Sequence, residues 1–327
     1  MHSFARRPLL AAALVGAGLR SRPAGAQAFP SRPVRFIVPF PPGNSTDIIA
    51  RFVAEDLSKR WPQRVVVENR SGGAGAVGME AGARSPADGY TLTVGTSGTL
   101  GVNPSVIPRL SYNPERDFAP ITNFATMPLI LLARPQLEAN TLAQLQAMAR
   151  AKPGEFGFGS PGPGTAGHMA GEYLFHRAGI RLTHVPYRGT GPALADLLAG
   201  NLPLVSDSLA SALPHLREGR LKALVVTSRQ RAPQLPEVPT AAEALGQEFE
   251  ATGWIGLVAP AGTADDLITQ INSDVVDILR DPATAQRLLM LGGSPDPGTP
   301  ADFGRFIAAE IAKWAEVARI ANVRLEG

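Results

Sequence analysis

The sequence predicts an α/β protein of two lobes, each built on a parallel sheet with helices on both faces. The first observation is that short apolar runs typical of strands alternate with helical patterns over residues 34–94. The second is that the same alternation starts again over residues 142–226. The third is the stretch 118–134, where two apolar runs follow each other without a helical pattern between them. We interpret this stretch and the apolar run at residues 253–260 as two strands that cross between the lobes.

The first unit of the chain predicts a strand, a stiff turn and a well-capped helix. The run Val34–Val38 has the branched and aromatic residues of a buried strand, and the prolines after it forbid its continuation. Gly43 then frees the backbone, residues 44–46 are all competent N-cap residues, and Asp47 complements the dipole of the first turn. The pattern therefore places the open end of a helix over residues 47–60 at the tip of a loop.

The rest of the first lobe repeats this arrangement. Strands are predicted at residues 65–69 and 90–94, with a helix over residues 77–83 between them. Loops rich in glycine or hydroxyl groups follow these strands, at residues 71–78 and 95–99. Because ligands bind at the carboxyl ends of parallel strands, we expect the loops to meet at one edge of the sheet.

The second lobe is predicted to have the same architecture. Its strands are expected at residues 156–160, 182–185, 202–205 and 221–226, and its helices at residues 142–151, 165–178, 192–199 and 209–218. After the returning strand, helical patterns at residues 264–280, 282–291 and 301–321 are expected to pack on the first lobe. The predicted domains are residues 29–123 plus 252–327 for the first lobe and residues 124–251 for the second. Two such lobes form a clamp that closes by hinge motion.

The N-terminus predicts export. Residues 1–28 read as a signal peptide, with a basic start at Arg6 and Arg7 and an apolar run, Leu9–Leu19, that is too short to span a bilayer. A small-residue cleavage site ends at Ala28. We expect cleavage near Ala28 after export by the Sec or the twin-arginine route.

Removal of the signal peptide changes the charge balance. Residues 1–28 contain four arginines and no acidic residue, so 27 of the 31 basic residues remain against 28 acidic ones. A nearly neutral mature chain predicts no nucleic-acid partner. The absence of cysteine excludes disulfides, cysteine nucleophiles, thiolate metal sites and a lipid-modified N-terminal cysteine. No later run approaches the ~18 apolar residues of a membrane span, so we expect a soluble mature protein that is not inserted in the membrane.

Two helix starts predict a site for a carboxylate. The open N-terminus of a helix presents unpaired N–H groups and a partial positive charge, so the loop before residue 47 suits an anion. Its counterpart is residues 160–168, where a strand ends at Ser160, glycines loosen the chain and Thr165 caps the next helix. Two such ends that face each other across a cleft would hold a dicarboxylate with N–H and hydroxyl groups alone. The alternative is a pair of ordinary capped strand–helix units.

One glycine-rich motif has a competing interpretation. Gly73-Ala-Gly75-Ala-Val-Gly78 matches the dinucleotide fingerprint G-x-G-x-x-G. However, it follows the second strand, and the next strand ends without the acidic residue that would bind a ribose. We therefore interpret the motif as a tight turn whose glycines allow close packing.

The histidines do not predict chemistry. His168, Glu172 and His176 recur at intervals of four residues, a spacing that suits metal ligands but is more typical of a polar helix stripe. His184 and His215 have no serine and aspartate pattern that would complete a catalytic triad, and no common catalytic or phosphate-binding motif occurs. The sequence predicts no catalytic residue, no metal and no cofactor.

Two polar residues follow apolar strands of the second lobe. Asp207 is either the N-cap of the next helix or a group that orients a water, hydroxyl or amino group in the cleft. Arg188 has the charge to pair with a carboxylate, although solvent is the neighbour that we expect.

Segments along the whole mature chain together resemble one family. They read, in order, P-S-R-P-V-R-F-I-V-P-F-P-P-G-N-S-T-D-I-I-A-R, V-V-V-E-N-R, A-D-G-Y-T-L, Y-N-P-E-R-D-F-A-P-I-T, G-S-P-G-P-G-T-A-G-H-M-A-G-E, H-V-P-Y-R-G-T-G-P-A-L-A-D-L-L-A-G, A-L-V-V-T-S and G-L-V-A-P-A-G-T. As a set they resemble the substrate-binding proteins of tripartite tricarboxylate transporters, the Bug family. The resemblance implies a bilobal periplasmic-binding-protein fold, type II-like, and a periplasmic protein that hands a small carboxylate to the membrane permease subunits of a transporter.

The resemblance also implies the residues of the site. In that family the loop after the first strand and a G-S-x-G-x-G-T loop hold a ligand carboxylate, partly through ordered waters, and other loops complete the cleft. The expected ligand-binding residues here are Phe40, Gly43, Asn44, Ser45, Thr46, Asp47, Ser97, Thr99, Ser160, Gly162, Gly164, Thr165, Ala166, His168 and Asp207.

Three of these positions depart from the family or from a simple anion site. Asn44 stands where the family has the second glycine of P-P-G-G, and Ala166 stands where it has the serine of a Thr-Ser pair. Asp47 should repel a bare carboxylate unless water or an amino group lies between them, so we expect this position to discriminate among ligands.

The sequence thus predicts a monomeric binding protein that closes its lobes around a small organic carboxylate without covalent chemistry. One alternative is an exported hydrolase or lyase that uses His168 or Asp207 as its base. Another is a ligand sensor that acts on a membrane-bound signalling protein.

Overall fold

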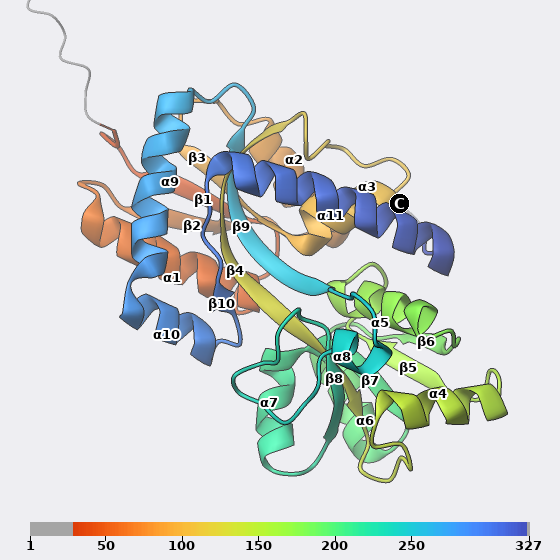
Figure 1. Cartoon of the computed structure of the whole chain (residues 1–327). Helices are drawn as coiled ribbons and strands as arrows, with labels where there is room; N and C mark the ends of the chain where they lie inside the picture. Colours follow the sequence, from red (N-terminus) through yellow and green to blue (C-terminus); the bar gives the residue numbers. More distant parts are fainter. Residues whose placement is uncertain (1–28, 326–327) are drawn as a thin grey trace, which may run out of the picture.

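Two long strands join two α/β lobes. The computed structural model describes residues 29–325, and the predicted signal peptide lies outside this range. The strands are β4 (Phe118–Ala133) and β9 (Thr252–Pro260), which lie between the upper and the lower lobe in Figure 1. Up to Pro128, β4 pairs with β9, and beyond it β4 pairs with strands of the second lobe. The two apolar runs of residues 118–134 therefore form one continuous strand.

The first lobe contains the N-terminal and C-terminal parts of the chain. Its elements before the crossing are β1 (Val34–Val38), α1 (Ser45–Arg60), β2 (Val65–Asn69), the 3₁₀ turn η1 (Gly73–Gly75), α2 (Ala76–Ala83), β3 (Thr91–Thr96), the π-helical turn η2 (Ser97–Val102) and α3 (Asn103–Val106). After the return they are α9 (Asp265–Arg280), α10 (Pro282–Met290), β10 (Ser294–Pro295) and α11 (Pro300–Ala321).

The second lobe is built from the middle of the chain, which is green in Figure 1. Its elements are α4 (Leu142–Ala151), β5 (Gly157–Ser160), α5 (Ala166–Arg177), β6 (Thr183–Pro186), α6 (Thr190–Ala199), β7 (Leu204–Ser208), α7 (Leu209–Arg217), β8 (Lys222–Val226) and the short α8 (Ala241–Leu245).

The strands of both lobes form one connected sheet. Its order is β2-β1-β3-β9-β4-β7-β5-β6, and β10 and β8 also pair with β4. The sets β2-β1-β3 and β7-β5-β6 are parallel, as the alternation predicts. In each lobe, however, the strand that enters from the other lobe is antiparallel to its neighbour, β9 beside β3 and β4 beside β7. This direction follows because an entering strand starts at the cleft, where the other strands end.

Each lobe has its own apolar core. In the first lobe, Phe36 of the sheet packs with residues of α1 and α9, and Met79 and Phe303 pack on the opposite face. In the second lobe, Phe158 packs with residues of α4 and α5, and Leu197 belongs to a cluster on the other side. The two rigid lobes position the loops that lie between them.

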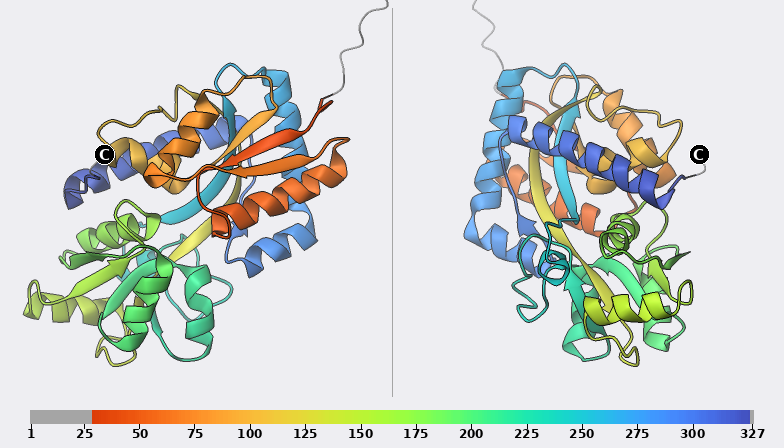
Figure 2. Two further views of the ribbon diagram at one scale, coloured as in Figure 1. Left: turned by 180° about the vertical axis from the view of Figure 1, so that it is seen from behind. Right: turned by 45° about the vertical axis from the view of Figure 1, so that its right-hand side comes forward.

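The last helix, α11, contacts both lobes. The sequence predicted that it packs on the first lobe alone, but at 22 residues it is roughly 33 Å long and extends beyond that lobe. Phe303 and Ile307 in its first half join the first-lobe core, whereas Trp314 and Val317 join the core of the second lobe. Both views in Figure 2 show its C-terminal half reaching toward α5.

A buried carboxylate holds α11 in place. Oε2 of Glu310 accepts hydrogen bonds from the indole N–H groups of Trp254 on β9 and Trp314 on α11, each 2.9 Å long. The other carboxylate oxygen pairs with Lys313. Glu310 is only 5% exposed, and the ion pair and both indole hydrogen bonds compensate its buried charge. They also tie the helix to a strand that crosses between the lobes.

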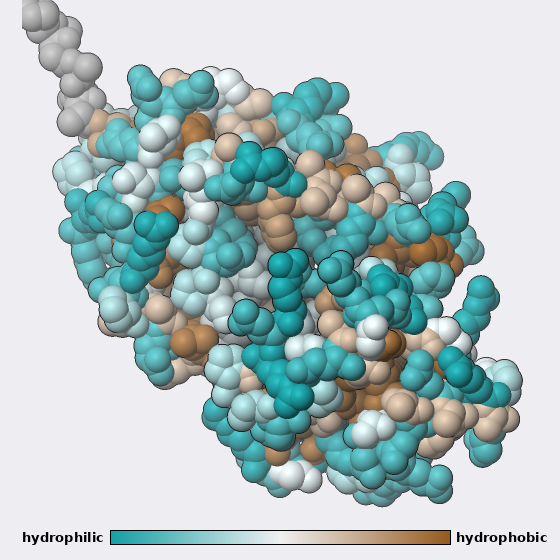
Figure 3. Space-filling view, in the orientation of Figure 1, coloured by the Kyte–Doolittle hydropathy of each residue, from teal (hydrophilic) through white to brown (hydrophobic). Residues whose placement is uncertain are grey.

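The surface is mostly hydrophilic. Figure 3 shows hydrophilic side chains over most of the face that it presents, with hydrophobic ones in small separate groups. Among the described residues, the large hydrophobic side chains that are exposed are Ile48, Val66, Val77 and Met290. None of the helices between residues 29 and 325 has the length and apolar character needed to cross a bilayer.

We predict that Glu310→Leu lowers the free energy of unfolding by about 2–5 kcal/mol, because two buried indole N–H groups and an ammonium group lose their acceptor. Urea unfolding followed by circular dichroism measures the change. The control is Glu316→Leu on the same helix, whose side chain is 65% exposed and should matter by no more than about 0.5 kcal/mol. Equal losses at the two positions would contradict the role assigned to Glu310.

Candidate functional site

A cavity of about 340 Å³ is lined by residues of both lobes. They come from loops at the carboxyl ends of strands in each lobe and from the two crossing strands. The lining residues are Phe40, Asn44, Ser45, Thr46, Ala74, Thr96, Ser97, Gly98, Asn103, Met127, Leu129, Pro161, Pro163, Gly164, Thr165, Ala166, Gly167, Thr190, Asp207, Ser208, Gly253, Trp254 and Ile255. The loops after parallel strands thus meet as the sequence predicted.

Three helical segments begin at the cavity wall in the same way. In each, the side chain of the N-cap residue accepts a hydrogen bond from the N–H group three residues later. The pairs are Asn44 with Asp47 at the start of α1, Thr96 with Thr99 at the start of η2, and Thr165 with His168 at the start of α5. The cap uses the third N–H group and leaves the first two without a partner inside the helix.

The residues that carry these first two N–H groups all line the cavity. They are Ser45 and Thr46 of α1, Ser97 and Gly98 of η2, and Ala166 and Gly167 of α5. The first two segments belong to one lobe and the third to the other. N–H groups and hydroxyls from both lobes therefore border the same space.

The electrostatics of the cavity come from the backbone. No arginine, lysine or histidine is among its lining residues in the part of the chain that the structure describes. The N-terminal ends of helices carry partial positive charge, and several of them point at one cavity. Met127, Leu129 and Trp254 add apolar surface. Such a site suits an organic anion of modest size, with its charged group on the helix starts and its carbon skeleton on the apolar wall.

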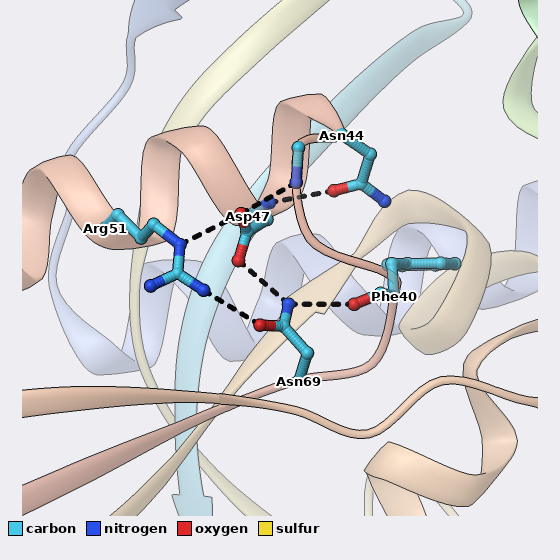
Figure 4. A network of polar contacts seen from close by, with 6 residues as sticks. Phe40, Asn44, Asp47, Arg51 and Asn69 are labelled. Carbon is cyan, nitrogen blue, oxygen red and sulfur yellow. Dashed lines mark hydrogen bonds and ion pairs between the residues drawn. The ribbon is translucent and has the colours of Figure 1, made fainter.

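Asp47 does not line the cavity, and its carboxylate belongs to a hydrogen-bond network of its own (Figure 4). Its Oδ2 accepts hydrogen bonds from the N–H of Gly43 at 2.9 Å and from Nε of Arg51 at 3.0 Å, and its Oδ1 accepts one from Asn69 at 2.8 Å. Burial alone would raise the pKa of Asp47, but these three bonds hold it below its ordinary value. Asp47 is thus outside the cavity lining, and its charge is satisfied within its own lobe.

The same network fixes the loop after β1. Asn69, at the end of β2, donates a second hydrogen bond to the carbonyl oxygen of Phe40 at 2.9 Å, and Phe40 lines the cavity. Asn44, which replaces the glycine of the family motif, caps α1 with its side chain. The substitution therefore strengthens the helix start that faces the cavity.

His168 lies behind the second-lobe loop and not in the cavity. Its Nδ1 accepts a hydrogen bond from the N–H of Gly164 at 3.1 Å, and its ring stacks on that of His184 with 3.7 Å between the ring centroids. Nε2 of His184 lies 2.7 Å from the hydroxyl of Ser160. Burial, and then the neighbouring His168 ring, lower the pKa of His184 to about 3. Local sequence pattern does not reveal this stacked histidine pair, which supports the loop over residues 160–164.

Close packing also fixes the start of α5. A Cβ atom on Gly167 would lie 2.5 Å from the carbonyl oxygen of Ser206, so only glycine lets this helix approach β7. Gly78 has a similar role in the first lobe, where a Cβ atom would lie 2.6 Å from the carbonyl oxygen of Arg70. The motif over residues 73–78 thus forms a tightly packed turn, in keeping with our interpretation. Ala74 of that motif lines the cavity.

Asp207 is the acidic residue of the cavity wall. It is 3% exposed, and its Oδ1 accepts the N–H of Ser208 at 2.6 Å. Its Oδ2 is buried and has no hydrogen-bond partner in the described part of the chain. Burial raises the pKa of Asp207 to about 6, although the Ser208 N–H and the nearby hydroxyls of Thr190 and Ser211 oppose the rise. The N-cap of α7 is Ser208 and not Asp207, so the capping interpretation of this residue is wrong.

The predicted site residues divide into two groups. Those that line the cavity are Phe40, Asn44, Ser45, Thr46, Ser97, Gly164, Thr165, Ala166 and Asp207. Those that lie outside its lining are Gly43, Asp47, Thr99, Ser160, Gly162 and His168. Each member of the second group makes hydrogen bonds within or next to a lining loop.

Sequence reasoning missed several lining residues. Thr190, the first residue of α6, lines the cavity, whereas the neighbouring Arg188 is exposed. The position of Thr190 in a loop that follows a strand was the signal that could have identified it. Trp254 lies on the returning strand, and nothing in its local pattern marks it as facing a ligand. Among residues 29–325 no group of three or more histidine, aspartate and glutamate side chains could hold a metal ion. Of the three residues His168, Glu172 and His176, whose spacing suits metal ligands, the first two lie close together, with 3.7 Å between His168 Nε2 and Glu172 Oε1.

Two α/β lobes joined by two crossing strands, with a ligand-sized cavity lined by both, are the architecture of a two-lobed solute-binding protein. The family model described as "Tripartite tricarboxylate transporter family receptor" matches residues 49–323. The chain belongs to this family of substrate-binding proteins, which are not enzymes.

Known relatives agree in sequence and in fold. Protein BugT of Bordetella pertussis is 37% identical over 305 residues, which cover 93% of this chain and 94% of BugT. The structure of R. palustris Rpa4515 with adipate has a TM-score of 0.81 at 36% identity and covers 90% of this chain and 99% of that one. The structure of MatC from Rhodopseudomonas palustris with bound malate has a TM-score of 0.76 at 33% identity and covers 88% and 99% of the two chains. The Bug-family resemblance and the periplasmic-binding-protein fold are confirmed.

We predict that Asp207→Asn stabilises the protein at alkaline pH. The folded carboxyl has a pKa of about 6 against 3.8 for the ordinary group, so the folded state binds its proton more tightly than the unfolded state does. Ionisation therefore destabilises the fold progressively as the pH rises from about 4 to about 6, and fully above that. The gain in unfolding free energy should grow by about 2 kcal/mol between pH 4.5 and pH 8.

Urea unfolding at the two pH values measures this gain. Asp196→Asn is the control, because Asp196 is in the same lobe, accepts a hydrogen bond from Tyr187 and does not line the cavity. It should show no gain that grows with pH. A gain for Asp207→Asn that does not depend on pH would refute the assignment.

Proposed function

We propose that this protein is a periplasmic solute-binding protein that captures a small organic carboxylate by lobe closure and delivers it to the permease subunits of a tripartite tricarboxylate transporter. The observation that carries the proposal is the ring of three capped helix starts, contributed by both lobes, around a cavity whose lining contains no cationic side chain. A carboxylate fits such a site because it accepts several N–H bonds at once and gains from the helix dipoles.

The binding residues that we propose fall into two layers. The predicted residues that line the cavity would contact the ligand directly or through water. The predicted residues outside the lining would act indirectly, by holding the loops in a shape that leaves the first N–H groups of each helix free. These residues are Gly43, Asp47, Thr99, Ser160, Gly162 and His168. The removal of any of these six would change ligand affinity through loop position.

Closure follows from the division of the site between the lobes. We take residues 29–123 plus 252–327 and residues 124–251 as the two moving parts. A ligand held by Ser45 and Thr46 on one side and by Ala166 and Gly167 on the other makes its full set of bonds only when both lobes approach. Binding then shifts the population toward the closed form.

Several observations support the setting of this function. The predicted signal peptide over residues 1–28 and the membership of the family suit a periplasmic monomer that meets a membrane permease. The relatives with adipate and malate suggest the size of the ligand. Adipate and malate are both small dicarboxylates, and a cavity of about 340 Å³ accommodates molecules of that class.

The proposal predicts that small carboxylates raise the melting temperature of the protein. A ligand present at 100 times its dissociation constant should stabilise the folded state by about 2.7 kcal/mol. A thermal-shift screen of mono-, di- and tricarboxylates, with neutral sugars and divalent metal ions as controls, measures this. If the sugars or metals shift the protein and no carboxylate does, the proposal is wrong.

A second prediction concerns Thr165, whose hydroxyl caps α5 at the cavity wall. Thr165→Val should weaken carboxylate binding roughly tenfold, because the hydroxyl and the loop position set by its 2.7 Å bond to the Gly162 carbonyl oxygen are lost. The matched control is Thr141→Val, which removes the cap of α4 in the same lobe, away from the cavity. Both variants should lose about 1 kcal/mol of stability. In calorimetry only Thr165→Val should lose affinity, and equal affinities in the two variants would contradict the proposal.

A further inference from the structure

The second-lobe loop over residues 161–165 borders the cavity but keeps its backbone N–H groups to itself. Pro161 and Pro163 have no N–H group. The other three N–H groups of the loop donate within the lobe. They bind as follows: Gly162 to the Ser160 hydroxyl at 3.2 Å, Gly164 to Nδ1 of His168 at 3.1 Å, and Thr165 to the Gly162 carbonyl oxygen at 3.3 Å. This loop therefore has no backbone donor for a ligand.

The hydroxyl groups that the second lobe contributes to the lining also have partners within that lobe. The pairs are Thr165 with the Gly162 carbonyl oxygen at 2.7 Å, Ser208 with the Ser211 hydroxyl at 3.0 Å, and Thr190 with the carboxylate of Asp207. Position 166, the first of α5, is an alanine and adds no hydroxyl. The donors that this lobe leaves for a ligand are thus the N–H groups of Ala166 and Gly167.

The first lobe contributes most of the donors in the cavity wall. The first two N–H groups of α1 belong to Ser45 and Thr46, and those of η2 belong to Ser97 and Gly98. All four residues line the cavity, and three of them carry a hydroxyl. A carboxylate has two oxygens with about four acceptor positions. The first lobe alone therefore has enough donors for one carboxylate.

The wall on the other side of the cavity is largely apolar. Pro161, Pro163 and Ala166 belong to the second lobe, and Leu129 lies on the part of β4 that pairs with it. Among residues 29–325 the one charged side chain in the lining is Asp207 of this lobe, which is acidic. A second carboxylate placed here would lose its hydrogen bonds to water and approach a like charge. An alkyl or aryl group would instead bury apolar surface.

We propose that the site is selective for monocarboxylates with an apolar body, which bind with the carboxylate at the first-lobe helix starts and the alkyl or aryl body against the second-lobe wall. Pro161, Pro163 and Ala166 set this preference, because each withholds a donor from that wall. The inference rests on the proposed function and deepens it, since it names the class of carboxylate. A cavity of about 340 Å³ admits monocarboxylates and dicarboxylates alike, so the donors and not the size decide.

The test is calorimetry at pH 8 with matched pairs of ligands. The members of each pair share a carbon skeleton and differ in that a methyl group of one is a carboxylate in the other: butanoate and succinate, hexanoate and adipate, 4-methylbenzoate and terephthalate. In the pair that contains the tightest ligand, we expect the monocarboxylate to bind at least tenfold more tightly, because the second carboxylate of its partner exchanges water for a wall with few donors.

Ala166→Ser is the decisive variant, since it adds a hydroxyl to the second-lobe wall. We expect the preference for the monocarboxylate to fall below threefold, through tighter binding of the dicarboxylate. Ala195→Ser is the matched control, because Ala195 is exposed on α6 of the same lobe and does not line the cavity. This control should keep the wild-type preference. Unfolding curves establish that both variants are folded.

The outcomes separate the two proposals. If the dicarboxylate of the tightest pair binds as tightly as the monocarboxylate or more tightly, the inference is wrong and the proposed function stands. If Ala166→Ser leaves the ratio of the two affinities unchanged, the second-lobe wall does not set the preference, and the inference is again wrong. If no carboxylate of any pair binds, the proposed function itself fails and the inference falls with it.

Discussion

The structure depends on one constraint: among the described residues the cavity lining has no cationic side chain, so its positive potential must come from helix starts held at fixed positions. Partial charges at helix ends fall off within about one turn, so the N–H groups must lie at the ligand itself. This explains why α1, η2 and α5 are capped alike, with the third N–H group used internally and the first two left at the cavity. A cap that consumed the first N–H groups would remove the donors that the site needs.

Much of the surrounding polar structure serves to hold these starts. In the first lobe, the carboxylate of Asp47 accepts hydrogen bonds from Gly43, Arg51 and Asn69. Asn69 also donates to the carbonyl oxygen of Phe40 and so fixes the loop there. In the second lobe, a stacked histidine pair holds the loop, since His168 accepts the Gly164 N–H and His184 lies at hydrogen-bond distance from the Ser160 hydroxyl. Neither Asp47 nor His168 lines the cavity. The electrostatic potential inside it is therefore set by the backbone N–H groups and by Asp207.

The sequence predicts those parts of this arrangement that depend on local chemistry. The order of strands and helices, the caps at Asn44 and Thr165 and the loops at strand ends can all be read from residue types and spacing. What cannot be read is the direction of a side chain whose partner is distant in sequence. Asp47 is turned toward Asn69, 22 residues away, and His168 of α5 stacks on His184 of β6. Trp254 lines the cavity because β9 crosses between the lobes, which is a property of the whole topology.

The crossing elements also link the site to the rest of the molecule. Trp254 contributes to the cavity wall, and its indole N–H is bound by Glu310 of α11, which also binds Trp314 in the core of the second lobe. Gly101 of η2 packs against the Trp314 ring, where a Cβ atom would lie 3.0 Å from Cδ1. A displacement of α11 would therefore move a helix start of the first lobe together with a wall of the cavity. Because α11 also packs on α5, it contacts helix starts on both sides of the cleft, and a movement of one lobe relative to the other must change the packing of α11 on at least one of them.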